Sequence, residues 1–137
     1  MLTTERIMLI ENNPKDTSDI LSIINSIDNR FKWTYFKAPQ EASEYLKNGN
    51  DLPHLILLES GSNNHDSIEF IKTVKKDTNL KRIPIVIISP SNEPTQVFES
   101  FHNGVAGYMV KPQDDQELTD VINTIINYWN MCILPSA

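Results

Sequence analysis

The sequence predicts a three-layer α/β sandwich in which helices cover both faces of a parallel sheet. Residues 7–10, 55–58 and 83–88 are apolar runs without the alternation of a half-exposed strand, as is typical of strands buried on both faces. Polar residues follow each run, and a segment with helical apolar spacing comes next. Strands that alternate with helices at such short intervals predict a doubly wound α/β domain.

Local signals place five strands and five helices along the chain. The expected strands are residues 7–10, 33–36, 55–59, 83–88 and 107–110. The expected helices start at Pro14, Pro39, Asp66 or Ser67, Thr95 and Asp114. Two starts carry capping signals, because Asn13 precedes Pro14 and Asp114 is followed three residues later by Glu117.

The commonest five-stranded solution of this class is the flavodoxin-like strand order 2-1-3-4-5. We expect one domain, residues 4–131, and a C-terminal tail, residues 132–137, because a chain of 137 residues is too short for two ordinary domains. The helix from Thr95 is the weaker one, and its expected buried side is made of Val97, Phe98 and Phe101. The last helix has the clearest apolar stripe, which comprises Leu118, Val121, Ile122, Ile125, Ile126 and Trp129.

Composition and charge narrow the functional classes. A formal net charge of −6 argues against a nucleic-acid surface, which requires a basic patch. The single Cys132 has no partner for an internal disulfide and suits a reducing compartment. No apolar stretch approaches the length of a membrane span, and the first residues lack the layout of a signal peptide. We therefore expect a cytoplasmic protein without a nucleic-acid or membrane partner.

Polar side chains stand at the carboxyl ends of four expected strands. Glu11 and Asn12 follow the first strand, Glu59 ends the third, Ser89 follows the fourth and Lys111 follows the fifth. In open parallel sheets the ligand crevice lies beyond these strand ends. The sequence therefore predicts that these side chains converge on one polar pocket.

Five motifs occur in order along the chain: residues 10–14 (IENNP), 55–59 (LILLE), 66–70 (DSIEF), 83–89 (IPIVIIS) and 104–112 (GVAGYMVKP). In their order and in their positions relative to the expected strands, these motifs resemble those of the receiver domain of two-component response regulators, the CheY-like family. The resemblance extends over nearly the whole chain. Asn13-Pro14, residues 80–84 and the Tyr128-Trp129 ending are most similar to the single-domain regulators that serve bacterial phytochrome kinases.

This resemblance implies a role for each residue at the strand ends. Glu59 stands at the position of the aspartate that takes a phosphoryl group from a histidine kinase. Glu11 and Asn12 stand where two acids help to hold Mg²⁺. Ser89 and Lys111 retain the hydroxyl and the ammonium that contact the phosphoryl group.

Two replacements change the expected chemistry of this pocket. Glu59 carries its carboxylate one methylene, about 1.5 Å, beyond the reach of an aspartate, and in-line phosphoryl transfer is sensitive to shifts of about 1 Å. Asn12 supplies an amide where Mg²⁺ prefers a carboxylate. We therefore expect weak or no metal binding at Glu11, Asn12 and Glu59, no other cofactor, and the Lys111 ammonium as the cation of the pocket.

The resulting hypothesis is an atypical, non-enzymatic single-domain response regulator that acts through protein–protein contacts and is not phosphorylated in the normal way. Its expected partner is a sensor histidine kinase or another signalling protein. The resemblance also implies a contact surface on the fourth helix, fifth strand and fifth helix, which would serve for a partner or for a homodimer. Tyr108 stands at the position of the switch aromatic of the family's fifth strand. No output segment is expected after Trp129.

Three alternatives stay open at this point. In the first, the fixed charge of Glu59 partly mimics the phosphorylated state, with one negative charge where a phosphoryl group brings nearly two. In the second, the chain is still a phosphorylatable, Mg²⁺-dependent receiver. In the third, it is a flavodoxin-like binder of a small ligand, although it lacks a glycine-rich phosphate loop.

Overall fold

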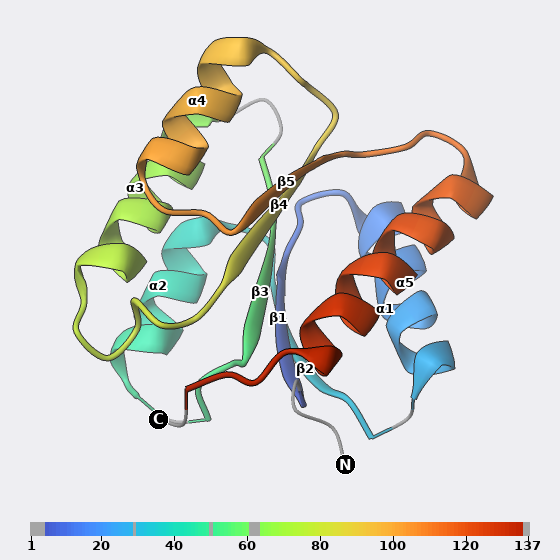
Figure 1. The fold of residues 1–137 in the computed structure, drawn as a ribbon, viewed down its shortest axis with the longest axis horizontal. Helices are drawn as coiled ribbons and strands as arrows, with labels where there is room; N and C mark the ends of the chain where they lie inside the picture. Colours follow the sequence, from blue (N-terminus) through green and yellow to red (C-terminus); the bar gives the residue numbers. More distant parts are fainter. Residues whose placement is uncertain (1–4, 29, 50, 61–63, 136–137) are drawn as a thin grey trace.

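A computed structural model describes residues 5–28, 30–49, 51–60 and 64–135. Five parallel strands form one sheet with the order β2-β1-β3-β4-β5, which confirms the predicted flavodoxin-like topology (Figure 1). The strands are β1 (Arg6–Ile10), β2 (Lys32–Phe36), β3 (Leu55–Glu59), β4 (Ile85–Ser89) and β5 (Gly107–Val110). The helices are α1 (Pro14–Ile27), α2 (Pro39–Lys47), α3 (Asn64–Lys76), α4 (Pro94–His102) and α5 (Asp115–Met131).

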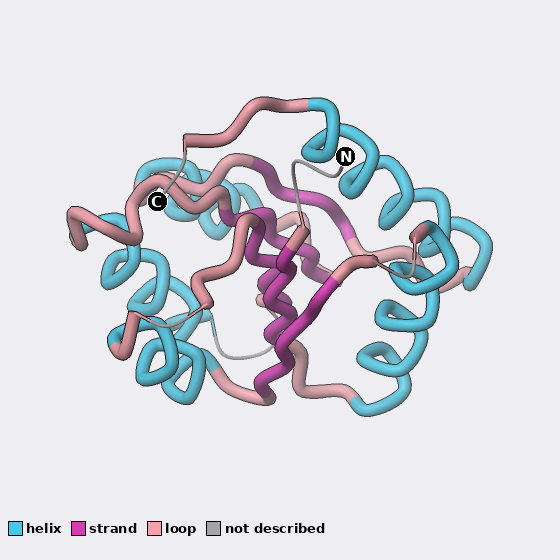
Figure 2. Tube along the Cα trace, turned by 90° about the horizontal axis from the view of Figure 1, so that it is seen from below, coloured by secondary structure: helices cyan, strands magenta, loops and turns pink. Residues whose placement is uncertain are grey.

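The helices form two layers on opposite sides of the sheet. Figure 1 shows α1 and α5 on one side of the strands and α2, α3 and α4 on the other, and Figure 2 shows the twisted sheet between the two layers from below. Among the described helices, none is long and apolar enough to cross a membrane.

The central strand β3 explains why its sequence is apolar without alternation. Leu55 and Leu57 pack in the core shared with α1 and α5, whereas Ile56 and Leu58 pack in the core shared with α2 and α3. All four side chains are completely buried. A strand covered on both faces loses the hydrophobic–polar alternation of a half-exposed strand. Glu59 is the last residue of β3 and is only partly buried, so it lies at the polar rim of the sheet directly after four buried residues.

Two helix starts have the predicted caps. The Asn13 side chain accepts a hydrogen bond from the Asp16 backbone N–H at 3.1 Å, with Pro14 in the first turn of α1. The Asp114 side chain accepts one from the Glu117 backbone N–H at 3.1 Å. These bonds satisfy donors that a helix leaves without an intrahelical partner, and they fix where the chain leaves β1 and enters α5.

Besides one-residue shifts at the starts of β1, β2 and α5, three boundaries differ from the prediction. α3 begins at Asn64, so Asp66 and Ser67 lie inside the helix instead of capping it. β4 begins at Ile85, because the preceding Pro84 has no N–H to contribute to the ladder, and it extends through Ser89. α4 begins at Pro94, one residue before the predicted Thr95, and its cap is Glu93, whose carboxylate accepts two backbone N–H groups.

The predicted buried side of α4 is wrong at Phe98 and Phe101, whereas Val97 is half-buried. Phe98 is 69% exposed and Phe101 is 49% exposed, whereas Ser100 is completely buried and donates a hydrogen bond to the Gln96 carbonyl at 2.8 Å. The polar face of this short helix therefore turns inward, and two aromatic side chains turn toward solvent.

Candidate functional site

The carboxyl ends of the strands bring together the predicted pocket residues. Glu11 follows β1, Glu59 ends β3, Ser89 ends β4, and Lys111 follows β5. β3 lies between β1 and β4 in the sheet, and β5 pairs with β4. The backbone N–H of Lys111 donates to the Ser89 carbonyl at 2.6 Å, which extends this pairing beyond β5 and holds the lysine at the rim.

The Lys111 ammonium forms two short polar contacts at the site. Its Nζ donates to Glu11 Oε1 at 2.6 Å and to Asp16 Oδ2 at 2.9 Å. The Glu11 side chain is 1% exposed, that of Lys111 12% and that of Asp16 26%. Burial keeps water from screening these charges, so this is a partly buried ion-pair network and not a surface salt bridge.

Carboxylates dominate the electrostatics around this lysine. Burial by itself lowers the pKa of Lys111, but the hydrogen bonds to Glu11 and Asp16 act in the opposite direction. The negative charges of Glu11 and Glu59 add to this effect. The net result is a Lys111 pKa above its ordinary value of 10.5, so the ammonium stays charged.

Asp16 is a member of this network that the sequence reasoning missed. It lies in the first turn of α1, where a carboxylate is commonly explained by the helix dipole alone. The available signal was its position, since α1 starts directly at the end of β1 and its first turn overhangs the same rim. A carboxylate there can reach a side chain that arrives from the end of β5.

Ser89 and Tyr108 are joined through the loop between β4 and α4. The Ser89 hydroxyl, completely buried, donates to the Ser60 carbonyl at 2.8 Å and accepts the Ser91 backbone N–H at 3.1 Å. The Tyr108 hydroxyl donates to the Ser91 carbonyl at 2.7 Å. Ser91 is thus held from both sides, by the end of β4 and by β5.

The described side chains do not form a divalent-metal site in this arrangement. The Lys111 ammonium binds one oxygen each of Glu11 and Asp16, and the second Glu11 oxygen accepts the Asn13 backbone N–H at 3.3 Å. Asn12 is exposed. No group of three or more His, Cys, Asp or Glu side chains within the described ranges is placed to hold a metal ion. Weak or absent metal binding at this rim stays a prediction.

Comparison with known proteins identifies the family. A family model described as the response regulator receiver domain matches residues 7–123, which is most of the chain. The chain belongs to this family. The receiver domain is the part of a two-component system that receives the signal, so the predicted signalling class is confirmed, whereas the roles of the individual rim residues stay predictions.

Individual relatives point in the same direction. The chain is 24% identical to a probable methanogenesis regulatory protein, FilR2, of Methanothrix harundinacea over 127 residues, covering 90% of this chain and 82% of that protein. It is 29% identical to the response regulator Rcp1 of Synechocystis sp. over 99 residues, covering 72% of this chain and 66% of that protein.

Two crystal structures share the fold. The phosphorylated cyanobacterial phytochrome response regulator RcpA superimposes with a TM-score of 0.89 at 28% identity, covering 97% of this chain and 99% of that one. The Mn²⁺-bound form of Rcp1 superimposes with a TM-score of 0.86 at 24% identity, covering 96% and 99%. The predicted resemblance to regulators that serve phytochromes is thus confirmed.

Proposed function

We propose that this chain is a receiver domain that signals through protein contacts with a fixed charge at Glu59 in place of a phosphorylation cycle. The observation that carries the proposal is the Lys111 ammonium, which two carboxylates hold at the rim. Two of the three N–H donors of this ammonium bind the carboxylates of Glu11 and Asp16, so an incoming phosphoryl group would compete with these partly buried carboxylates for the lysine. A histidine kinase or another signalling protein of the cytoplasm is the proposed partner.

Glu59 supports the same proposal from the other side of the pocket. Glu59 is the last residue of β3, and the resemblance to receiver domains implies that it stands in place of the phospho-acceptor aspartate, with its carboxylate one methylene farther out. Its negative charge acts on Lys111 without any modification of the protein. In-line transfer depends on exact positioning of the nucleophile, so the longer side chain disfavours the reaction.

The bonds around Ser91 suggest how the rim communicates with the surface. Ser89 holds the Ser91 N–H, and Tyr108 holds the Ser91 carbonyl, so a change at the end of β4 moves the loop to which Tyr108 is bonded. The Ser89 hydroxyl already donates to the Ser60 carbonyl. We therefore propose that the connection from Ser89 through Ser91 to Tyr108 is held in a single conformation.

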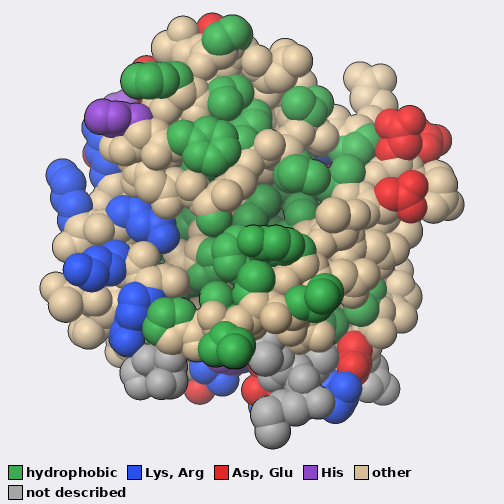
Figure 3. Space-filling view, viewed as in Figure 1, with side chains coloured by type: hydrophobic (Ala, Val, Ile, Leu, Met, Phe, Trp, Pro, Cys, Tyr) green, Lys and Arg blue, Asp and Glu red, His purple; other side chains and the backbone are tan. Residues whose placement is uncertain are grey.

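The contact surface of the proposal is the face formed by α4, β5 and α5, which we call the aromatic face. Its exposed apolar side chains are Phe98, Phe101, Val110, Tyr128 and Met131. Figure 3 shows hydrophobic side chains gathered over these elements, with the charged groups toward the edges of the view. Contiguous exposed apolar surface of this kind marks interaction sites.

We propose a second copy of the chain as the occupant of the aromatic face. A two-fold contact places the same surface on both subunits, so it must complement itself. An uncharged patch does so, whereas surfaces that carried the net charge of −6 would repel each other.

Phosphorylation tests the proposal directly. Purified protein is incubated with Mg²⁺ and acetyl phosphate, and the intact mass is measured for the wild type and for Glu59→Gln. We expect no stoichiometric gain of a phosphoryl group in either protein. A full gain in the wild type that disappears in Glu59→Gln would show that Glu59 is a working phospho-acceptor and would refute the fixed-charge proposal.

One observation favours the alternative of a working, Mg²⁺-dependent receiver. The relative RcpA is described in a phosphorylated state, and Rcp1 is described with bound Mn²⁺. If this chain retains that chemistry, the side chains that bind the metal would be those of Glu11, Asn12 and Glu59. Titration with Mn²⁺, followed by paramagnetic broadening of backbone amide signals at these residues, separates the alternatives. We expect no site-specific broadening at millimolar Mn²⁺.

Self-association is measured by sedimentation velocity over a range of protein concentrations. Phe98→Asp places a charge in the aromatic face and should abolish the dimer, while leaving the fold intact because the side chain is 69% exposed. Trp33→Asp is the matched control, since Trp33 is a 42% exposed aromatic on the opposite edge of the sheet, and it should leave the dimer unchanged. A wild-type monomer at all concentrations would refute the second-copy assignment.

The charge at Glu59 should also influence this dimer if it holds one signalling state. Glu59→Ala removes the charge and should weaken association, whereas Glu41→Ala, an exposed carboxylate on α2, should have no effect. Equal association constants in both variants would show that the charge of Glu59 does not influence dimer formation.

A further inference from the structure

β2 is the end strand of the sheet on the side away from β5. One of its two edges pairs with β1, and no strand among the described residues pairs with the other. The Lys32 N–H donates to the Glu5 carbonyl at 2.9 Å, which directs the backbone groups of Lys32 toward β1. Because these groups alternate along a strand, those of Trp33 and Tyr35 point away from β1. We call this unpaired side the outer edge of β2.

The outer edge of β2 carries backbone groups that the domain itself does not use. Trp33 and Tyr35 each contribute one N–H and one C=O group to it. Within the described ranges, no loop, helix or side chain forms a hydrogen bond to these groups. Such a row of free donors and acceptors is a template on which another extended segment adds a strand to the sheet.

Lysines flank the outer edge of β2. Lys32 begins the strand and Lys37 follows it, and both side chains are exposed. Neither lysine forms an ion pair with a carboxylate of the described residues. Residues 31–37 contain no aspartate or glutamate, although the chain as a whole has a net charge of −6. This local positive charge favours an acidic segment as the partner of the edge.

The two faces of β2 offer different side chains to an added strand. Tyr35 packs against the core shared with α1 and α5, whereas Phe36 packs against the core shared with α2 and α3. Alternation therefore places Trp33 on the α1 side and Thr34 on the α2 side. Trp33 is 42% exposed on this end strand. Its ring can pack against an apolar side chain of the neighbouring strand, which is the contact that stabilises strand pairs.

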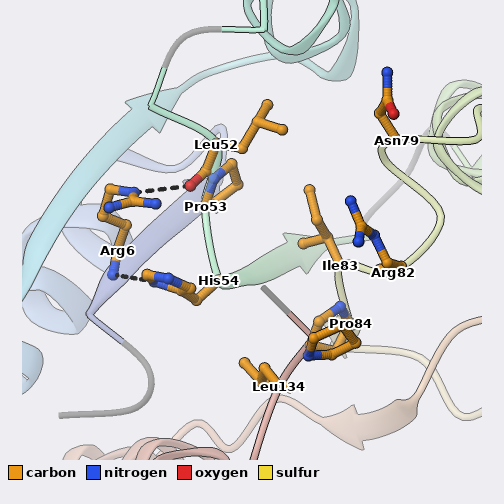
Figure 4. Close-up of a pocket in the computed structure, with 10 residues that line it drawn as sticks. Arg6, Leu52, Pro53, His54, Asn79, Arg82, Ile83, Pro84 and Leu134 are labelled. Carbon is orange, nitrogen blue, oxygen red and sulfur yellow. Dashed lines mark hydrogen bonds between the residues drawn. The ribbon is translucent and has the colours of Figure 1, made fainter. Parts of the chain in front are cut away.

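A cavity of about 220 Å³ lies beside the same strand. Its lining includes Lys32 and Thr34 of β2, Tyr45 of α2, and Arg6, Asp51 and Pro53. Arg6 is fixed at this wall because its Nε donates to the Leu52 carbonyl at 2.8 Å (Figure 4). The volume is below the roughly 300–1,000 Å³ of small-molecule sites, so the cavity suits one large side chain better than a whole ligand. In strand addition, pockets of this kind select alternate side chains of the added segment.

A second copy of β2 does not suit this edge. Antiparallel pairing of two β2 strands about a two-fold axis would bring Lys32 of each copy near Lys37 of the other. Like charges opposite each other destabilise a strand pair. An acidic segment converts the same two lysines into ion-pair partners.

We propose that the outer edge of β2 binds an extended acidic segment of a partner protein, which joins the sheet as an additional strand. The backbone groups of Trp33 and Tyr35 form its ladder hydrogen bonds. Lys32 and Lys37 pair with carboxylates toward its two ends, and an aromatic side chain between them enters the cavity beside Tyr45. The aromatic face lies along β5 at the other edge of the sheet, so this binding is independent of the proposed dimer.

Hydrogen exchange measured on ¹⁵N-labelled protein tests strand addition, with the capped peptide Glu-Glu-Val-Tyr-Val-Glu-Glu as the probe. In the free protein, the Trp33 and Tyr35 amides should exchange faster than the Thr34 and Phe36 amides, which face β1. At saturating peptide, exchange at Trp33 and Tyr35 should slow by about tenfold or more, because their N–H groups then enter a ladder. Absence of added protection at millimolar peptide would overturn the proposal.

The same measurement tests the chemistry of the occupant. A peptide in which lysine replaces every glutamate should bind about tenfold more weakly or worse. Equal binding of the two peptides would overturn the acidic class of partner. Protection of the Trp33 amide that rises with protein concentration in the absence of peptide would identify a second copy as the occupant, and this result would also overturn the proposal.

Variants distinguish the edge from general attraction to positive charge. Lys32→Glu combined with Lys37→Glu should weaken binding of the acidic peptide by about tenfold or more, and the fold should be retained because both side chains are exposed. Lys76→Glu combined with Lys81→Glu is the matched control, since it changes the net charge equally at two exposed lysines away from β2. It should leave the affinity unchanged. Equal losses in the two double variants would overturn the site. Glu59→Gln should bind as the wild type does, which keeps this test separate from that of the proposed signalling function.

Discussion

Replacement of Lys111 by methionine tests the ion-pair network most directly. Methionine keeps much of the length and apolar character of the lysine stem but removes the ammonium that binds Glu11 and Asp16. Glu11, with a side chain that is 1% exposed, is then left as a buried carboxylate without its counter-ion. We expect this uncompensated charge to dominate the effect on stability.

The magnitude follows from the burial of each partner. Removal of one member of a buried ion pair costs about 3–5 kcal/mol. Two features reduce this value: the Asn13 N–H still donates to Glu11 at 3.3 Å, and Asp16 is 26% exposed and is solvated when the ammonium is removed. We therefore expect Lys111→Met to lower the free energy of unfolding by about 2–4 kcal/mol near neutral pH.

Urea denaturation followed by circular dichroism measures this cost. Lys15→Met is the matched control, because Lys15 pairs with Asp19 at 2.7 Å on the surface, and its loss should produce no measurable change. Addition of Glu11→Gln to Lys111→Met should recover part of the loss at neutral pH.

Two results would refute this reasoning. If Lys111→Met and Lys15→Met have the same stability, the network contributes no more than a surface pair. If the double variant with Glu11→Gln is less stable than Lys111→Met alone, the loss arises from packing and not from an unpaired carboxylate.

Three further predictions concern the same region and the turn before β5. Tyr108→Phe removes one hydrogen bond to the loop after β4 and should lower the free energy of unfolding by about 1 kcal/mol in urea denaturation. Gly104→Ala should cost about 1–3 kcal/mol, because φ is +104° and the new Cβ would lie 3.2 Å from Lys75 Cγ. Gly107→Ala, which meets only ordinary contacts, is its control and should cost much less. The pKa of Lys111 lies above 10.5, so its contribution to stability is complete below that pH and is lost as the pH rises through the raised pKa. Alkaline unfolding should show this loss in the wild type and not in Lys111→Met.

The fold was predictable because its main signals are local and redundant. β3 is hydrophobic on both faces, Asn13 and Asp114 cap their helices, and short connections leave few topologies to consider. The boundaries that were wrong depend on weaker signals. Pro84 is compatible with the residue before a strand as well as with its start, and several polar residues precede α3.

The site was predictable in its location but not in its pairing. Strand ends in a parallel sheet meet at one rim, so Glu11 and Lys111 could be placed together from the sequence. The choice of Asp16 as the second partner depends on the rotation of α1 about its axis, which a short amphipathic pattern specifies only approximately.

The aromatic side chains of α4 show the opposite error. Phe98 and Phe101 are hydrophobic, and sequence reasoning placed them in the core, but hydrophobic residues are not confined to the interior. The inward side of α4 is occupied by Ser100, whose hydroxyl is satisfied within the helix by the Gln96 carbonyl. A prediction based on hydrophobicity alone selects the wrong face when the buried polar residue is small.

The Glu11–Lys111 pair joins residues that are 100 positions apart in the sequence. It forms only after β1 and the end of β5 have been brought to the same rim, which requires β3 and β4 to be in place between them. Closure of so long a loop is costly before other contacts compensate for it, so we expect this pair to be absent from the folding transition state. Loss of the pair should therefore accelerate unfolding while leaving the folding rate nearly unchanged, and in this way a charge network at the rim determines how long the native domain persists.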